Sequence, residues 1–329
     1  MDTPAELGEF LRTRRGRLRP EDVGLVSYGV RRRVPGLRRE ELAQLAGVSA
    51  AYYTRLEQGQ SGNASEAVLD ALARALRLSH DEHAHLRNLA RPNRAKRRPP
   101  ERPDRARTGT RQLIAAMDAV PAIVLNRRTE VLAWNALGHA LIAGHLDPTS
   151  PDRPEDRPNL QRLLFLDSHT RELYPRWDEE ARRAVSSLRL VAGGHADDRR
   201  LAELIGELLM NSAEFEALWS LHPVRNCTSG TKSFHHPLVG PMDLAFETLH
   251  TADDSGHRVL LYSAERGSPA EAGLRLLREV SVHVPVDVST FLDSKATAHP
   301  GRDRSGLRRP RRADVAPVSG TPVDTSPEA

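Results

Sequence analysis

A glycine turn between two short amphipathic segments constrains the fold of this 329-residue chain more than any other feature. Leu42, Leu45 and Ala46 fall at positions i, i+3 and i+4, which places one apolar stripe on a first helix. Gly47 follows directly and supplies the backbone freedom that a sharp exit from a helix needs. Ser49 is a favourable N-cap, so a second helix begins after a turn of only about three residues.

The second predicted helix has two faces with different chemistry. At roughly 100° per residue, Tyr53 and Leu56 point inward and hold the helix against its neighbour. The opposite face carries small and polar side chains, which are residue types that contact base edges in a DNA groove. The predicted base-reading residues are Ala51, Thr54, Arg55 and Gln58.

This region resembles the Cro/repressor-type (XRE) helix-turn-helix family. The matching positions are Gly47 in the turn, the small Ala43 four residues before it, and the apolar Val48, Tyr53 and Leu56 after it. The resemblance implies that the second helix, residues 50–58, lies in the major groove of DNA. In that family an amide at the start of the first motif helix usually meets a phosphate, and Arg39 holds that place here. A helical hairpin inside a larger α domain is the alternative interpretation.

A basic loop from about Gly16 to Gly36 precedes the motif and is longer than the family norm. Three consecutive arginines in this loop are candidates for phosphate or minor-groove contacts, and a solvated loop without DNA contacts is the alternative. The complete set of predicted DNA-contacting residues is Arg31, Arg32, Arg33, Arg39, Gln44, Ser49, Ala50, Ala51, Tyr52, Thr54, Arg55 and Gln58.

Amphipathic segments on both sides of the motif predict a five-helix, all-α domain of the lambda-repressor-like type over residues 1–91. Leu7 and Phe10 share one face of a helix near the N-terminus. Two later helices begin after the N-cap residues Ser65 and Ser79. The motif therefore sits in the middle of a small helical domain.

Charge is distributed unevenly along the chain. Residues 1–112 hold 23 Lys and Arg against 14 Asp and Glu, whereas residues 113–280 hold 18 against 24. A basic first part and an acidic second part are typical of a DNA-binding domain joined to a domain with another role. The formal net charge of the whole chain, +4, hides this asymmetry.

Composition argues against several classes of protein. Cys227 is the only cysteine, so no internal disulfide can form, and we expect no metal site. His235 and His236 are adjacent, and neighbours on a strand point to opposite faces. No apolar run approaches the roughly 18 residues of a membrane span and no secretory signal is evident, so we expect a cytoplasmic protein without a membrane partner. No nucleophile elbow, P-loop or dinucleotide fingerprint occurs, so we predict neither an enzyme nor a cofactor.

Two stretches with few apolar residues divide the chain. Residues 92–111 are rich in proline and arginine, which predicts a linker. Residues 281–329 are rich in Pro, Ser, Thr and Arg, which predicts a disordered tail. The stretch between them, residues 112–280, is long enough for a second domain.

The second domain is predicted to be α+β, with helices laid over one face of an antiparallel sheet. A hairpin is expected first, with strands at 123–125 and 131–134 around a turn at 126–129. Helices follow at 160–166, 185–190, 201–209 and 215–219. Later strands are predicted at 224–228, 232–236, 242–249 and 259–264, of which the last three form a meander.

This second domain resembles the ligand-binding domain of MmyB-like transcription regulators. The resemblance lies in the segments PAIVLNRRTEVLAWN, NLQRLLFLD, GTKSFHHPLVG and LLYSAERGSP, in this order. It implies a PAS-like fold, in which a five-stranded antiparallel sheet encloses a small cavity against its helices. It also implies an association with fatty-acyl-type ligands.

A pocket for an acyl chain needs an apolar wall and one cationic or hydrogen-bonding end. The candidates to bind a carboxylate are Lys232, Arg225 and His235. The candidates for the wall are Trp134, Leu163, Phe165, Trp177, Trp219, Phe234 and Leu238. Ordinary core packing is the alternative role for each aromatic side chain, and an exposed strand position is the alternative for the lysine.

These patterns together predict a sequence-specific transcription regulator that binds double-stranded operator DNA and senses a small-molecule effector. One DNA-recognition helix, which we call the reader helix, contacts too few base pairs to specify a unique site in a genome. We therefore expect a homodimer that binds a palindromic sequence. The alternative is a DNA-tethered scaffold whose PAS-like domain binds only protein partners, which a filled cavity would favour. An antitoxin-like DNA binder would need a toxin-docking segment, and no such segment is evident.

Overall fold

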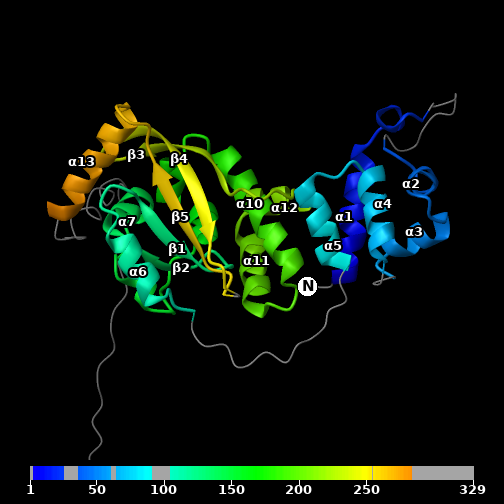
Figure 1. Ribbon diagram of the computed structural model, residues 1–329, viewed down its shortest axis with the longest axis horizontal. Helices are drawn as coiled ribbons and strands as arrows, with labels where there is room; N and C mark the ends of the chain where they lie inside the picture. Colours follow the sequence, from blue (N-terminus) through cyan, green and yellow to red (C-terminus); the bar gives the residue numbers. More distant parts are fainter. Residues whose placement is uncertain (1–2, 26–35, 61–63, 91–103, 254, 284–329) are drawn as a thin grey trace, which may run out of the picture. The chain divides into compact units, whose positions relative to one another are not determined.

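The computed structural model describes residues 3–25, 36–60, 64–90, 104–253 and 255–283 (Figure 1). A helical region is followed by a region built on a five-stranded antiparallel sheet, which confirms the predicted multi-domain, all-α plus α+β fold class. Most of the predicted linker and tail lies outside the described residues. The helices of the first region are α1 (Thr3–Arg17), η1 (Pro20–Val23), α2 (Arg39–Ala46), α3 (Ala50–Glu57), α4 (Glu66–Ala75) and α5 (His80–Ala90).

The five α-helices of the first region enclose one apolar core. Its fully buried side chains include Leu7, Phe10, Leu11, Leu42, Tyr53, Leu56, Leu72 and Leu86. The predicted inward face of the second motif helix is therefore confirmed. Leu45, in contrast, is 37% exposed, although it belongs to the apolar stripe predicted from the sequence. The reason is that α2 turns Leu42, Ala43 and Ala46 toward α3 and α4, which leaves Leu45 at the edge.

The turn between α2 and α3 has the predicted chemistry. Gly47 has a φ of 67°, a left-handed conformation that glycine adopts without steric cost. The Val48 N–H donates to the Ala43 carbonyl at 3.0 Å. The Ser49 hydroxyl accepts the Tyr52 N–H at 3.1 Å, as an N-cap should. Local hydrogen bonds thus set the path of the chain from one helix into the next.

A buried carboxylate connects three helices of this region. Glu57, the last residue of α3, is 1% exposed. It accepts hydrogen bonds from Arg15 of α1 at 2.9 and 2.8 Å and from Arg39 of α2 at 3.0 and 2.9 Å. Burial by itself would raise the pKa of Glu57, but the hydrogen bonds from the two arginines outweigh it and lower the pKa. The carboxylate therefore stays ionised and holds α3 against α1 and α2.

The loop between α1 and α2 is closed at its base. The Leu37 N–H donates to the carbonyls of Arg15 and Leu18 at 3.3 and 3.0 Å. A Cβ atom at Gly36 would lie 2.6 Å from the Gly16 carbonyl oxygen, so glycine is needed for this close approach. The chain therefore enters and leaves the long loop at one point on the helical core.

Five strands form a single antiparallel sheet in the order β2-β1-β5-β4-β3 (Figure 1). They are β1 (Ala122–Leu125), β2 (Val131–Trp134), β3 (Ser229–His236), β4 (Gly240–His250) and β5 (Arg258–Ser263). The helices of this region are α6 (Thr108–Ala115), α7 (Ala136–Ala143), η2 (Ser150–Asp152), α8 (Leu160–Leu166), α9 (Ser168–Leu173), α10 (Trp177–Gly194), α11 (Arg199–Asn211), α12 (Ala213–Ser220) and α13 (Pro269–His283). No helix in the described part of the chain is both long and apolar enough to traverse a bilayer.

Most of the predicted strands are present, with one exception. The first hairpin turns at residues 126–129, and β3, β4 and β5 form the predicted meander. The predicted strand at 224–228 was wrong, because the segment has no strand structure and begins with Val224 packed in the core of the helical region. There the Asn226 N–H donates to the Asp81 carboxylate of α5 at 2.9 Å.

Helices cover both faces of the sheet and not one face as predicted. On the face that we call the inner face, Ile123, Leu260 and Tyr262 belong to a core shared with α7 and α13. On the opposite face, Val124 packs with Ile114 of α6. All four residues of β1 are buried, and a continuous apolar run without alternation is the pattern of a strand that is covered on both faces.

The long helix α10 takes part in more than one core. Val185 and Leu188 pack in a cluster shared with α8, α11 and α12. Leu190 packs against the core of the helical region. A Cβ atom at Gly193 would lie 2.5 Å from Cε1 of the buried His85 ring of α5, so the two helices approach closely there. α10 therefore belongs structurally to both regions.

Replacing Glu57 with alanine should lower the free energy of unfolding by about 3–5 kcal/mol, because Arg15 then loses its buried carboxylate partner. Arg39→Ala should have a smaller effect, since the Arg39 side chain is 44% exposed and water replaces its partner. Urea unfolding at neutral pH measures both values.

The same pair of variants has a predicted pH dependence. The pKa of Glu57 is lowered on folding, so its contribution to stability is present above the ordinary carboxyl pKa and is lost as pH falls through the folded value. The difference between the original protein and Glu57→Ala should therefore narrow in acid. Equal unfolding midpoints at neutral pH would contradict the assigned role of Glu57.

Candidate functional site

One face of α3 is directed away from the helical core. Ala51 and Arg55 are exposed on it, whereas Tyr52 and Thr54 are half-buried. The Thr54 hydroxyl donates to the Ala50 carbonyl at 2.8 Å, so part of its hydrogen-bonding capacity is used within the helix. No hydrogen bond or ion pair joins the Arg55 side chain to any described residue. Arg55 is thus the cation of α3 that remains available to an external partner.

The remaining predicted DNA contacts fall into three groups. Gln44, Ser49, Ala50 and Gln58 are exposed around the two motif helices. Arg39 is exposed as well, but its guanidinium is bound to Glu57. The loop residues Arg31, Arg32 and Arg33 lie outside the described residues.

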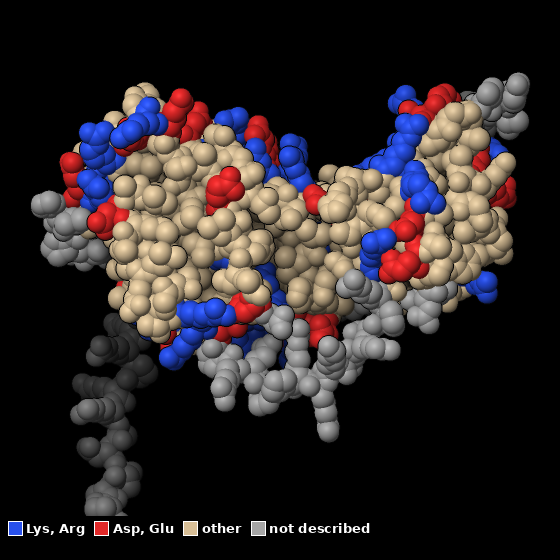
Figure 2. Space-filling view, viewed as in Figure 1, with Lys and Arg blue, Asp and Glu red and all other residues tan. Residues whose placement is uncertain are grey.

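Basic and acidic side chains are interspersed on the face of the molecule shown in Figure 2. On this face the described Lys and Arg side chains do not merge into one continuous basic surface. This view therefore shows no broad basic patch that would serve as a nucleic-acid interface, and the exposed face of α3 is the candidate that we consider.

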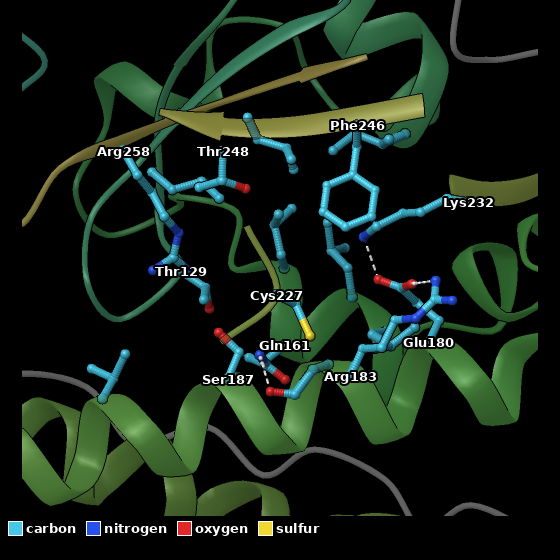
Figure 3. A pocket seen from close by; sticks show the side chains of 18 of the residues that line it. Thr129, Gln161, Glu180, Arg183, Ser187, Cys227, Lys232, Phe246, Thr248 and Arg258 are labelled. Atoms are coloured by element: carbon cyan, nitrogen blue, oxygen red, sulfur yellow. Dashed lines mark hydrogen bonds and ion pairs between the residues drawn. The ribbon is translucent and has the colours of Figure 1, made fainter. Parts of the chain in front are cut away.

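A cavity of about 280 Å³ lies between the inner face of the sheet and the helices α8 and α10 (Figure 3). Strand alternation brings every second residue of β4 and β5 to this face. The strand residues that line the cavity are Leu125, Lys232, Phe246, Thr248, His250, Arg258, Leu260 and Tyr262. The lining residues of α10 are Glu180, Arg183, Ala184, Ser187, Leu190 and Val191.

One end of the cavity is occupied by a neutralised charge cluster. The Lys232 ammonium donates to the Glu180 carboxylate and lies 5.1 Å from the centre of the Phe246 ring. Arg183 lies 3.8 Å from the same carboxylate. Burial would lower the pKa of Lys232, but the Glu180 charge outweighs burial and holds the pKa above its ordinary value. The lysine is therefore charged and already has a counter-ion.

A second cation lies at the other end of the cavity. Figure 3 shows the Arg258 side chain directed into the cavity from β5, beside Thr129 and away from Lys232. His250, its register partner on β4, has a lowered pKa, because of burial and the nearby charge of Arg258. Thr129 has a φ of 65°, which is unusual for a β-branched residue. Strain of this kind often accompanies functional sites.

The structure brings only some of the predicted ligand contacts to the cavity. Lys232 and Leu163 line it. Phe165, Trp177 and Trp219 pack instead in the cluster around α10, and Phe234 is in the inner-face core. Trp134 donates its indole N–H to the Pro148 carbonyl at 2.8 Å, outside the lining. Arg225, His235 and Leu238 are exposed.

Two groups of lining residues were missed by reasoning from the sequence. The polar face of α10 was missed because α10 was predicted only over 185–190, whereas it spans Trp177–Gly194. Arg258 was missed because the predicted strand began one residue later, at Val259. Its signal was present, since Arg258, Leu260 and Tyr262 alternate with period two and share one face.

Comparison with known families gives two matches. The family described as the MmyB-like transcription regulator ligand binding domain matches residues 106–277, more than half of the chain. The family described as a helix-turn-helix domain matches residues 6–86. Both resemblances inferred from the sequence are thus confirmed, and the matched families are regulator domains and not enzymes. None of the curated proteins matches the chain.

Lys232→Met should lower the free energy of unfolding by about 1–3 kcal/mol, because the buried carboxylate of Glu180 loses its main partner. The double variant Lys232→Met/Glu180→Gln should recover much of this loss, since the unpaired charge is gone. Arg199→Met is the matched control, because Arg199 pairs with Glu203 at the surface, and its effect should stay below about 0.5 kcal/mol. A double variant as unstable as Lys232→Met would argue against the pairing.

Proposed function

The chain belongs to the MmyB-like transcription regulators, and from this premise we propose that a small, mainly apolar ligand of fatty-acyl type controls its binding to a specific operator sequence. One observation carries the proposal: α10 lines the ligand cavity and also packs against α5 of the helical region. A ligand that displaces α10 at the cavity therefore also acts on α5 and on the helical region that contains the reader helix α3.

The proposed DNA contact is insertion of α3 into the major groove. Arg55 pairs with a guanine, Thr54 and Tyr52 contact phosphates or a thymine methyl, and exposed Arg39 adds charge near the backbone. Residues 1–91 form the DNA-reading domain in this proposal, and residues 112–280 form the sensing domain. Their largely separate apolar cores support this division.

We further propose that the protein binds as a homodimer. A single α3 contacts too few base pairs to define one genomic site, whereas two copies related by two-fold symmetry read both halves of a palindrome. Control by a ligand then requires different DNA affinities in two states, which a change in the spacing of the two reader helices supplies.

A set of buried contacts supports coupling between the two regions. Arg14 of α1 donates to the His222 carbonyl at 2.7 Å, and Arg189 of α10 lies 2.9 Å from Nδ1 of the same histidine. Burial and the charges of both arginines lower the pKa of His222 to about 4, so its ring is neutral and accepts the Arg189 N–H. His222 thus joins the two helices: its carbonyl accepts from Arg14 of α1, and its Nδ1 accepts from Arg189 of α10.

The scaffold interpretation is less well supported. It expects a sensing domain whose interior is filled by its own side chains. The cavity of about 280 Å³ is close to the lower limit of small-molecule sites in proteins. The same domain also directs charged and polar groups into that space, which a purely structural core does not need.

Selection of bound fragments from random DNA, followed by affinity measurements with and without decanoate, tests the proposed function. We expect one enriched palindromic sequence and a change in its dissociation constant when decanoate is added. Equal, weak affinity for all fragments, unaffected by decanoate, would reject the regulator proposal.

Arg55→Ala should weaken operator binding by about 1–3 kcal/mol and relax the preference at one base pair of each half-site. Fluorescence anisotropy against the operator and its single-base variants measures both effects. Arg74→Ala, on α4, is the matched control for loss of one positive charge. An equal loss of affinity on every sequence would show that Arg55 contacts only phosphate.

Gly193→Ala should keep ligand binding and reduce the effect of the ligand on DNA affinity, because the added methyl group collides with His85 at the contact between α10 and α5. Gly194→Ala is the control in the next position, where the nearest atom to an added Cβ is 3.7 Å away. Calorimetry measures the affinity for the ligand, and fluorescence anisotropy measures the change in DNA affinity that the ligand causes. An equal change in the two variants would show that the contact between α10 and α5 does not transmit the effect of the ligand.

A further inference from the structure

Arg258 differs from the other cations of the cavity in having no counter-ion. Its side chain is on the inner face of β5, and the structure gives it no hydrogen bond or ion pair with any described residue. Burial lowers the pKa of Arg258 to about 10, and no neighbouring carboxylate offsets this. Arg258 is half-buried, and even partial removal of a guanidinium from water without a partner is unfavourable in the ligand-free protein.

The charges that line the cavity leave one positive charge at the end where Arg258 lies. Lys232 and Arg183 share the carboxylate of Glu180, and Arg183 is also 3.7 Å from Glu179. Lys232, Arg183 and Glu180 lie together at the end of the cavity opposite to Arg258, so both cations there have a carboxylate partner (Figure 3). His250 adds no charge at neutral pH, because its pKa is lowered. Among the described residues, Arg258 is therefore the cation that faces the cavity without a compensating carboxylate.

A second polar group of the lining also has an unused hydrogen-bonding site. Gln161 is 5% exposed, and its amide nitrogen donates to the Ala184 carbonyl of α10 at 3.3 Å. This contact fixes the orientation of the amide, because a carbonyl accepts only from the NH₂ group. The Gln161 amide oxygen is then buried without a partner among the described residues. Such an acceptor is satisfied only by a hydrogen-bond donor, which a carboxylate lacks, so a water molecule or a ligand N–H or O–H group is its partner in the occupied cavity.

We propose that Arg258 binds the head group of a monoanionic, carboxylate-type ligand whose apolar body lies along Leu125, Phe246 and Leu260. The proposal rests on the proposed sensing function and specifies the ligand class and its orientation. Lys232, the more conspicuous cation in the sequence, does not bind the head group, because Glu180 already neutralises it. A dianionic phosphate head fits less well, since only one charge is left to compensate.

The test is calorimetric titration of the full chain with decanoate, decanol and decyl phosphate at neutral pH. Decanoate should bind roughly tenfold or more tightly than decanol, because a hydrogen bond to a charged group distinguishes them. Arg258→Leu should remove this preference, whereas Arg266→Leu, at an exposed arginine outside the cavity, should retain it. Arg258→Lys keeps the charge and should keep part of the preference.

Stability gives an independent readout for the same variants. Without ligand, Arg258→Leu should unfold at a temperature equal to or above that of the original protein, because a half-buried charge without a partner among the described residues is removed. Addition of decanoate should raise the unfolding temperature of the original protein more than that of the variant. A marked destabilisation by Arg258→Leu would show that the arginine is structural and would overturn the proposal.

Other outcomes also decide the matter. An unchanged decanoate preference in Arg258→Leu, tighter binding of decyl phosphate than of decanoate, or no saturable decanoate binding would each overturn the proposal. If the preference for decanoate over decanol is lost in Lys232→Gln/Glu180→Gln and kept in Arg258→Leu, the head group binds at the Lys232 end of the cavity and the proposal is wrong. If decanoate binds through Arg258 but leaves DNA affinity unchanged, the anion site stands and only the proposed regulatory function fails.

Discussion

The carboxylate of Glu57 is the interaction on which the reading surface depends. Helices α2 and α3 have eight residues each, a length that is not stable as an isolated helix in water. Their apolar side chains hold them to the core through contacts that have no fixed direction. Glu57 supplies a directional contact, because it accepts paired hydrogen bonds from α1 and α2 at a fixed geometry. The exposed face of α3 is therefore oriented by a polar contact on its buried side.

Helix α10 has a comparable role for the rest of the molecule. Residues three and four apart divide its surface into stripes, one for α11 and α12, one for the cavity and one for α5. A helix packed on all these sides cannot shift at the cavity without displacing its neighbours, because protein interiors are close-packed. The strained backbone of His222, with a φ of 48° directly before Pro223, lies where these contacts converge.

Local patterns in the sequence were sufficient for much of the fold. Gly47, Ser49 and Tyr53 have the predicted conformation, cap and burial, because each depends on neighbours within one or two helical turns. The strands with alternating or apolar patterns were found for the same reason. The errors have a common cause: Leu45, the segment 224–228 and the layer formed by α6 depend on how whole elements pack together, which local patterns do not specify.

The sequence by itself determined the two domain families, the reader helix and the antiparallel sheet, since these follow from periodicity, turn residues and family resemblance. Only the tertiary structure decided which charged side chains are engaged. It paired Arg39 with Glu57 and Lys232 with Glu180, and it left Arg258 facing the cavity alone. The physical reason is that a charge is compensated by groups nearby in space, and those groups lie 18 and 52 residues away in the chain.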